Sequence, residues 1–133
     1  MSKEMYSDAG LAFNSAKASA VVVTATTDPM QEVVTMTTGD LPAGKYMLGY
    51  SFELNFNNNK NKPAYFSMGG TYGSATKFAV IATDVTADDL NRYYSFPKDH
   101  AGGPITISLL FQKDSGTDVQ TVDFADVMVM RVA

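Results

Sequence analysis

Residues 45–56, KYMLGYSFELNF, alternate between apolar and polar or small side chains almost without exception. A period of two residues places successive side chains on opposite faces of a β-strand. At about 3.3 Å per residue this strand would span roughly 40 Å, which is longer than a usual strand, because most strands contain only about five or six residues. The face that we expect to be buried against a second sheet consists of Tyr46, Leu48, Tyr50, Phe52, Leu54 and Phe56. The opposite face consists of Met47, Gly49, Ser51, Glu53 and Asn55.

Almost every other segment is also strand-like. AVVVTATT (20–27), QEVVTMTT (31–38), TKFAVIAT (76–83) and ITISLLFQ (105–112) are rich in β-branched residues and are separated by turn signals. One short helical turn could form near 86–91. About eight strands without a helix of ordinary length predict an all-β protein, a single antiparallel β-sandwich of the jelly-roll kind. We expect residues 1–10 to form a flexible N-terminal arm and residues 11–133 to form the sandwich domain.

The last segment, VQTVDFADVMVMRV (119–132), is apolar on both parities. Asp126 would interrupt the apolar set that contains Phe124 and Met128 if the period held throughout. A β-bulge near Phe124–Ala125–Asp126 would exchange the two faces, and we predict one there. Burial of both faces, or an interface on the second face, is the alternative.

The charge balance limits the partners. The net charge is −4 and the ten Lys and Arg residues are scattered, which argues against nucleic acid because phosphate binding needs clustered basic residues. The first residues, MSKEMYSDAG, lack the basic start and apolar region of a secretory signal, and AVVVTA (20–25) is too short to span a membrane. We therefore expect synthesis in the cytoplasm and no membrane partner.

Catalytic and metal-binding groups are sparse. The single histidine, His100, lies in KDHAGGP (98–104), which has the composition of a loop and predicts a solvated side chain rather than a catalytic base. One histidine and no cysteine exclude a zinc site made of such ligands. Asp84, Asp88 and Asp89 could offer oxygens to calcium, but their spacing lacks the calcium-loop pattern and turn chemistry explains them better. We expect no metal and no cofactor.

Two carboxylates could in principle hydrolyse a glycosidic bond, and the candidates are Glu53, Asp123 and Asp126. The sequence does not place them opposite one another. Solvent-facing charge that discourages pairing at sheet edges is the commoner role of such residues in strands. We therefore predict that the protein is not an enzyme.

The chain carries seven tyrosines and eight phenylalanines. Most of them fall on apolar parities, which favours core packing, but carbohydrate-binding sandwiches also use such rings as stacking platforms. GGTYGSATK (69–77) is rich in glycine yet lacks the Gly-Lys-Ser/Thr order of a phosphate loop, so we interpret it as a mobile connection that exposes Tyr72. The candidates for exposed stacking rings are Tyr72, Tyr93 and Tyr94.

Two segments resemble known proteins. GDLPAGKYMLGYSFELNF (39–56) is similar to an opening strand of small viral and TNF/C1q-like jelly rolls. GPITISLLFQKDSG (103–116) followed by VDFADVMVMRV (122–132) is similar to the end of many tailed-phage structural proteins. The resemblance implies a jelly-roll fold and a role such as capsid decoration, head fibre or receptor-binding tip. Its motifs are structural, so it implies no functional residue.

These observations together favour a structural virion protein that decorates or cements a phage capsid. The expected partners are the major capsid protein or other virion subunits, with a homo-oligomer (dimer or trimer) of the chain itself, and the expected location is the virion. The residues predicted for a partner interface are Met5, Tyr6, Met47, Glu53 and Tyr72. The alternative is a carbohydrate- or host-receptor-binding module at a fibre or tail tip, for which the partner is a glycan.

Overall fold

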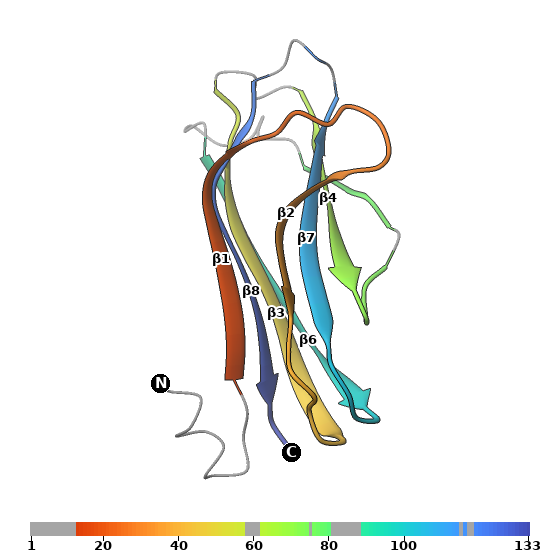
Figure 1. Cartoon of the computed structure of the whole chain (residues 1–133). Coiled ribbons are helices and arrows are strands. Elements are labelled where there is room, and N and C mark those ends of the chain that lie inside the picture. The colour runs from red at the N-terminus through yellow and green to blue at the C-terminus, as the bar shows by residue number, and fades with distance from the viewer. Residues whose placement is uncertain (1–12, 58–61, 75, 81–88, 115, 117–118) are drawn as a thin grey trace.

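Eight strands make up the regular structure of the chain in a computed structural model (Figure 1). The structure describes residues 13–57, 62–74, 76–80, 89–114, 116 and 119–133. The strands are β1 (Phe13–Val22), β2 (Gln31–Thr37), β3 (Gly44–Asn55), β4 (Ala64–Gly70), β5 (Phe78–Val80), β6 (Asp89–His100), β7 (Thr106–Lys113) and β8 (Thr121–Arg131). These ranges contain no helix, and so none that is long and apolar enough to cross a membrane.

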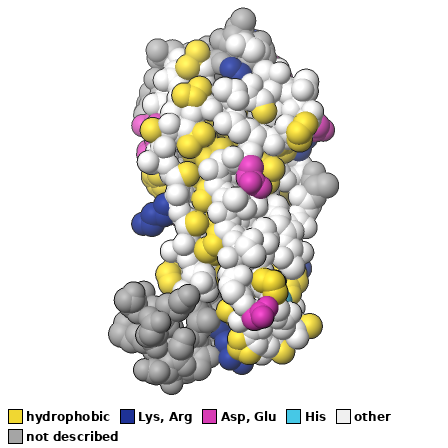
Figure 2. All heavy atoms as spheres, in the orientation of Figure 1, with side chains coloured by type: hydrophobic (Ala, Val, Ile, Leu, Met, Phe, Trp, Pro, Cys, Tyr) yellow, Lys and Arg dark blue, Asp and Glu magenta, His cyan; other side chains and the backbone are white. Residues whose placement is uncertain are grey.

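The strands form two antiparallel four-stranded sheets with the orders β1-β8-β3-β6 and β2-β7-β4-β5. Early and late strands therefore interleave in each sheet, and the chain crosses repeatedly from one sheet to the other. This order is the jelly-roll topology, so the predicted fold class is confirmed. On the side drawn in Figure 2, charged side chains stand singly among polar and apolar ones and form no basic patch.

The core lies between the sheets and is centred on β3. All six residues of the predicted aromatic-rich face are buried, with 1% or less of each side chain exposed. The Phe52 ring lies 5.0 Å from the rings of both Phe66 on β4 and Phe111 on β7, measured between centroids. Burial of each large side chain stabilises the fold by roughly 1.5–3 kcal/mol, so this row links the two sheets.

The predicted bulge in the last strand is confirmed, at Asp123. Glu53 on β3 pairs with Phe124, but the next residue, Leu54, pairs with Val122, so Asp123 is an extra residue in β8. Beyond the bulge the buried parity changes, and Ala125 joins Val122 in the core. Phe124 is turned to the outside of the sheet as a result, with 39% of its surface exposed.

Strand β6 corrects two sequence-based predictions. Leu90 and Asn91 belong to this strand and form no helical turn, and residues 98–100 continue it where a loop was expected. Pro97 is tolerated because β6 is the edge strand of its sheet, so the missing N–H faces no partner strand. At the other end of the chain, β1 ends at Val22, so most of the predicted strand 20–27 is the connection to β2. The predicted arm, residues 1–10, lies outside the described residues.

Candidate binding site

The outer face of the β1-β8-β3-β6 sheet is organised in rows, because antiparallel pairing sets one residue of each strand beside the next. One row consists of Lys17, Asp126, Ser51 and Tyr93. The neighbouring row consists of Ser15, Met128, Gly49 and Ser95, and the row beyond it of Phe13, Met130, Met47 and Pro97. The fold thus brings segments from both ends of the chain together on one surface.

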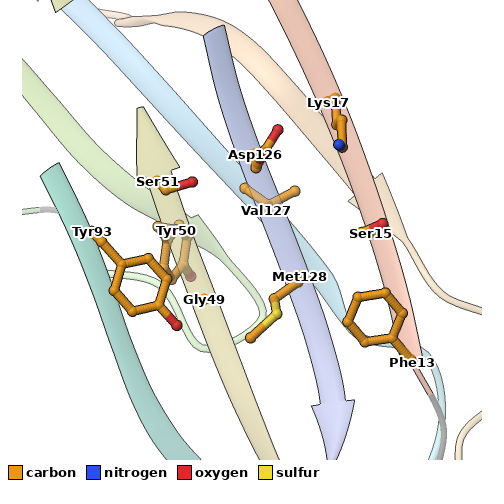
Figure 3. Close-up of a pocket in the computed structure, with 10 residues that line it drawn as sticks. All are labelled: Phe13, Ser15, Lys17, Gly49, Tyr50, Ser51, Tyr93, Asp126, Val127 and Met128. Carbon is orange, nitrogen blue, oxygen red and sulfur yellow. The ribbon is translucent and has the colours of Figure 1, made fainter. Parts of the chain in front are cut away.

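A hollow of about 380 Å³ opens on this face around Gly49 (Figure 3). A Cβ atom at position 49 would lie 3.0 Å from Cε of Met128 and 3.5 Å from the hydroxyl oxygen of Tyr93. Figure 3 shows these two side chains reaching toward each other from β8 and β6 across the glycine. Because Gly49 has no side chain, the side chains of Met128 and Tyr93 can pack close to the backbone of the sheet. We call this surface the Gly49 hollow; its other lining residues are Phe13, Ser15, Lys17, Tyr50, Ser51, Asp126 and Val127.

Only one of the three tyrosines proposed as stacking rings is well exposed. Tyr93 has 60% of its surface exposed and lines the Gly49 hollow. Tyr94, the next residue along the strand, faces inward and stacks on Phe66 with 5.4 Å between centroids. Tyr72 is half-buried, and its hydroxyl lies 2.6 Å from Nδ1 of His100. The expectation that Tyr72 is exposed on its loop is therefore corrected.

Four polar side chains of the Gly49 hollow lack partners. Within the described part of the chain, the side chains of Ser15, Lys17, Ser51 and Asp126 make no hydrogen bond and no ion pair. Lys17 and Asp126 stand opposite each other on β1 and β8, and Ser51 follows on β3. The hollow therefore combines a cation, a carboxylate and two hydroxyl groups, all able to bond a ligand.

A second hollow, of about 440 Å³, lies on the outer face of the β2-β7-β4-β5 sheet. Several of its polar groups are bonded within the fold: Ser67 Oγ donates to the carbonyl oxygen of Ser74 at 3.1 Å, and Lys77 Nζ lies 2.6 Å from Asp28 Oδ1. None of the described residues that line it is aromatic. We therefore regard the Gly49 hollow as the better candidate for a binding site.

Three carboxylates meet beside the β8 bulge, at one end of the same face as the Gly49 hollow. Ligand oxygens of Glu53, Asp89 and Asp123 all lie within 4.8 Å of one another. Burial and the adjacent Asp89 carboxylate raise the pKa of Asp123, and a hydrogen bond from Asn55 opposes that rise. Among the described residues this is the group whose spacing could hold a cation through oxygen ligands.

The acidic residues singled out in the sequence thus separate into two places. Glu53 and Asp123 come together with Asp89, whereas Asp126 lies apart in the Gly49 hollow. Of the three possible calcium ligands, only Asp89 is described, and Asp84 and Asp88 lie outside the described residues. This grouping depends on the pairing of β3, β6 and β8, which the sequence did not indicate.

His100 is buried, with 7% of its surface exposed, and is not the solvated loop residue that the sequence predicted. Its Nε2 lies 2.9 Å from the carbonyl oxygen of Gly103, which can only accept, so Nε2 carries the proton. Nδ1 is then the acceptor for the Tyr72 hydroxyl. The Tyr46 ring packs edge-on against the imidazole. His100 therefore connects the end of β6 by hydrogen bonds to the loops that contain Tyr72 and Gly103.

The residues predicted for a partner interface are dispersed. Met47 and Glu53 lie half-buried on the same outer face as the Gly49 hollow, and Tyr72 packs against His100 on another part of the molecule. Met5 and Tyr6 lie outside the described residues. The sequence analysis missed Phe13, Ser15 and Lys17. Their signal was the alternation of FNSAKASA (13–20), in which small alanines occupy one parity.

No family model matches the sequence, and no curated protein matches it. Among solved structures, the chain is similar to the EclA C-terminal domain, described as a sugar-binding protein. The TM-score is 0.50 and the identity 9%, over 87% of this chain and 78% of that one. It is also similar to the globular domain of zebrafish complement 1qA, with TM-score 0.49 and 8% identity over 90% of this chain and 95% of that one.

A third similar structure is the carbohydrate-binding module CBM36 in complex with calcium and xylotriose. Its TM-score is 0.43 and its identity 16%, over 86% of this chain and 87% of that one. At such identities a likeness concerns the fold alone. The sandwich fold implied by the resemblance in the sequence is confirmed, and the phage origin implied by the same segments gains no support from these likenesses.

Proposed function

We propose that this protein is a non-catalytic carbohydrate-binding module and that the sugar occupies the Gly49 hollow. One observation carries the proposal: an exposed tyrosine ring stands beside four polar side chains that have no partner within the described part of the chain. Half-buried polar groups of folded proteins, such as Ser51 and Asp126 here, are normally bonded, whereas the exposed Ser15 and Lys17 can bond water. Polar side chains without a protein partner, placed around the exposed ring of Tyr93, can bind a ligand that has both polar groups and an apolar face.

A pyranose ring has C–H groups on its faces and hydroxyl groups around its edge. The C–H face can pack on the electron-rich face of Tyr93. Each sugar hydroxyl both donates and accepts hydrogen bonds, as Ser15 and Ser51 also do, while Lys17 only donates and ionised Asp126 only accepts. The Gly49 hollow therefore offers complementary groups to both parts of a sugar.

The printed description of the EclA domain as a sugar-binding protein agrees with this proposal. The chemistry of the face also favours binding over catalysis. Asp126 lies apart from the Glu53, Asp89 and Asp123 group, and the buried His100 has both ring nitrogens bonded. The proposed role is therefore recognition of a glycan without its cleavage.

Binding to a glycan array tests the proposal. We expect saturable binding by the wild-type protein and its loss in Tyr93→Ala, because the stacking surface disappears. Tyr65→Ala is the matched control, since Tyr65 lies on the opposite sheet with its hydroxyl 3.3 Å from Asp114. Absence of saturable binding by the wild type, or equal binding by Tyr93→Ala, contradicts the proposal.

A second candidate is the structural subunit of an oligomer, of which a capsid decoration protein is the version favoured by the sequence. The observation behind it is the fully apolar row Phe13, Met130, Met47 and Pro97 on the same outer face. Such a row could pack against another subunit. Sedimentation distinguishes the two: a dimer or trimer that Met47→Glu dissociates supports the subunit. A monomer that also fails to bind capsids lacking it rejects this role.

A further inference from the structure

The Gly49 hollow continues into two further hollows on the same outer face. The second, of about 340 Å³, shares Ser51 and Tyr93 with the first. The third, of about 420 Å³, shares Lys17 and Asp126 with the first. Phe124 lines both the second and the third. The three hollows therefore adjoin one another across the sheet, and we refer to them together as one depression.

Two exposed rings stand along this depression, on opposite sides of β3. Tyr93 is on β6 and Phe124 is on β8, and β3 lies between these strands. The backbones that carry the two rings are two strand spacings apart, about 10 Å, so we assign a separate sugar unit to each ring. The bulge at Asp123 is what turns Phe124 outward, with 39% of its surface exposed. The fold therefore provides a second aromatic platform beyond the first.

Charge restricts the kind of ligand that this depression can hold. The cations along it are Lys17 and Arg92. The carboxylate of Asp126 lies within it, and Glu53, Asp89 and Asp123 lie at its end next to Phe124. Among the described residues of this face, carboxylates therefore outnumber cations, and a sulfated or uronate-rich chain would meet like charge.

Resting on the proposed function, we infer that the site binds an extended, uncharged oligosaccharide that crosses β3, with one unit on Tyr93 and another on Phe124. The unit at Tyr93 occupies the Gly49 hollow and bonds to Ser51 and Asp126. The unit at Phe124 lies on the far side of β3. A terminal single sugar would use only the first of these two positions.

Calorimetric titration with a chain-length series tests this inference. The probes are cello-, xylo-, manno- and chito-oligosaccharides of one to six units, with a heparin-derived hexasaccharide as the anionic comparison. For a series that binds, we expect affinity to rise about tenfold or more between one unit and four, as the second ring is engaged. Phe124→Ala should remove this rise and leave binding of the single sugar unchanged.

Phe78→Ala is the matched control, because Phe78 on the opposite sheet has 38% of its surface exposed. Equal affinity for one unit and for longer chains in the wild type overturns the inference while the proposed function stands. An unchanged rise in Phe124→Ala, or heparin binding as tight as that of neutral chains, also overturns it. Failure of every sugar to bind in the titration, together with a negative glycan array, rejects the proposed function itself.

Discussion

On the outer face of the β2-β7-β4-β5 sheet, hydroxyl groups bond one another across the strands, whereas the described residues on the outer face of the β1-β8-β3-β6 sheet show no such bond. Thr35 Oγ1 lies 2.9 Å from Ser108 Oγ, and Thr37 Oγ1 lies 2.8 Å from Thr106 Oγ1. Ser51 has no such partner among the described residues, although it stands in the middle of its own sheet. Both faces are rich in small polar residues and both follow the same period of two.

The difference shows that composition does not decide whether a face can bind a ligand. On the outer face of the β2-β7-β4-β5 sheet, Thr35, Thr37 and Ser67 use their hydroxyl groups within the fold, and the Lys77–Asp28 ion pair joins the two loops beside this face. On the other face the same kind of groups remain available around an exposed ring. Substitutions on the two faces should therefore separate stability from binding.

The largest expected effect is common to both faces, because they share one core. Phe52→Ala removes the ring that lies 5.0 Å from Phe66 and from Phe111. We expect it to lower the free energy of unfolding by about 3–5 kcal/mol, measured by chemical denaturation. Tyr93→Ala should cost much less, because its ring is exposed. A loss below about 1 kcal/mol for Phe52→Ala would mean that the row on β3 does not hold the sheets together.

The next effect concerns two glycines at equivalent places on the two faces. A Cβ atom at Gly49 would meet the flexible Met128, and one at Gly69 would meet Leu110 Cδ1 at 2.9 Å. Gly49→Val fills the Gly49 hollow, so we expect sugar affinity to fall about tenfold or more in titration. Gly69→Val should leave affinity unchanged. Equal affinities of the two variants would place the sugar elsewhere.

A smaller effect distinguishes bonded from unbonded serines. Ser108→Ala removes a buried hydroxyl and its bond to Thr35, which should lower the free energy of unfolding by about 1 kcal/mol. Ser51→Ala removes no bond within the described part of the fold, so its effect on stability should stay within about 0.5 kcal/mol. Denaturant unfolding of both variants checks this. A larger loss for Ser51→Ala would show that its hydroxyl is already used within the fold.

The sequence predicted the inner face of β3 because alternation alone decides which residues of a strand share a face. It also predicted the bulge near Phe124, since Asp126 conflicted with a constant period. It failed at β6, where the composition of KDHAGGP (98–104) suggested a loop, whereas residues 98–100 continue the strand. The edge position of β6 makes Pro97 acceptable in it. His100 was wrongly predicted to be a solvated loop residue because it belongs to the same segment.

The candidate site was less predictable than the fold. Tyr93 was named from the sequence, but so were Tyr72 and Tyr94, and the choice depends on which way each ring faces. Lys17 and Asp126 meet only because β1 pairs with β8 in one register. Alternation assigns residues to faces but does not identify partner strands or register, and these depend on pairing over long sequence distances.

The smallest expected effect concerns charge on the two faces. Burial and the adjacent Asp89 carboxylate raise the pKa of Asp123 above its unfolded value, so the folded state binds a proton more tightly than the unfolded state. Stability from this group is therefore present at low pH and is lost as the pH rises through the raised pKa.

At neutral pH, Asp123→Asn should raise the melting temperature, and the difference from wild type should shrink as the pH falls. Asp28→Asn, which breaks the ion pair with Lys77 on the opposite face, should not raise it. The prediction is contradicted if the melting temperature of Asp123→Asn at neutral pH is at or below that of the wild type. Such a result would mean that the repulsion among Glu53, Asp89 and Asp123 is already relieved, for example by a bound cation. Addition of a chelator would then lower the melting temperature of the wild type.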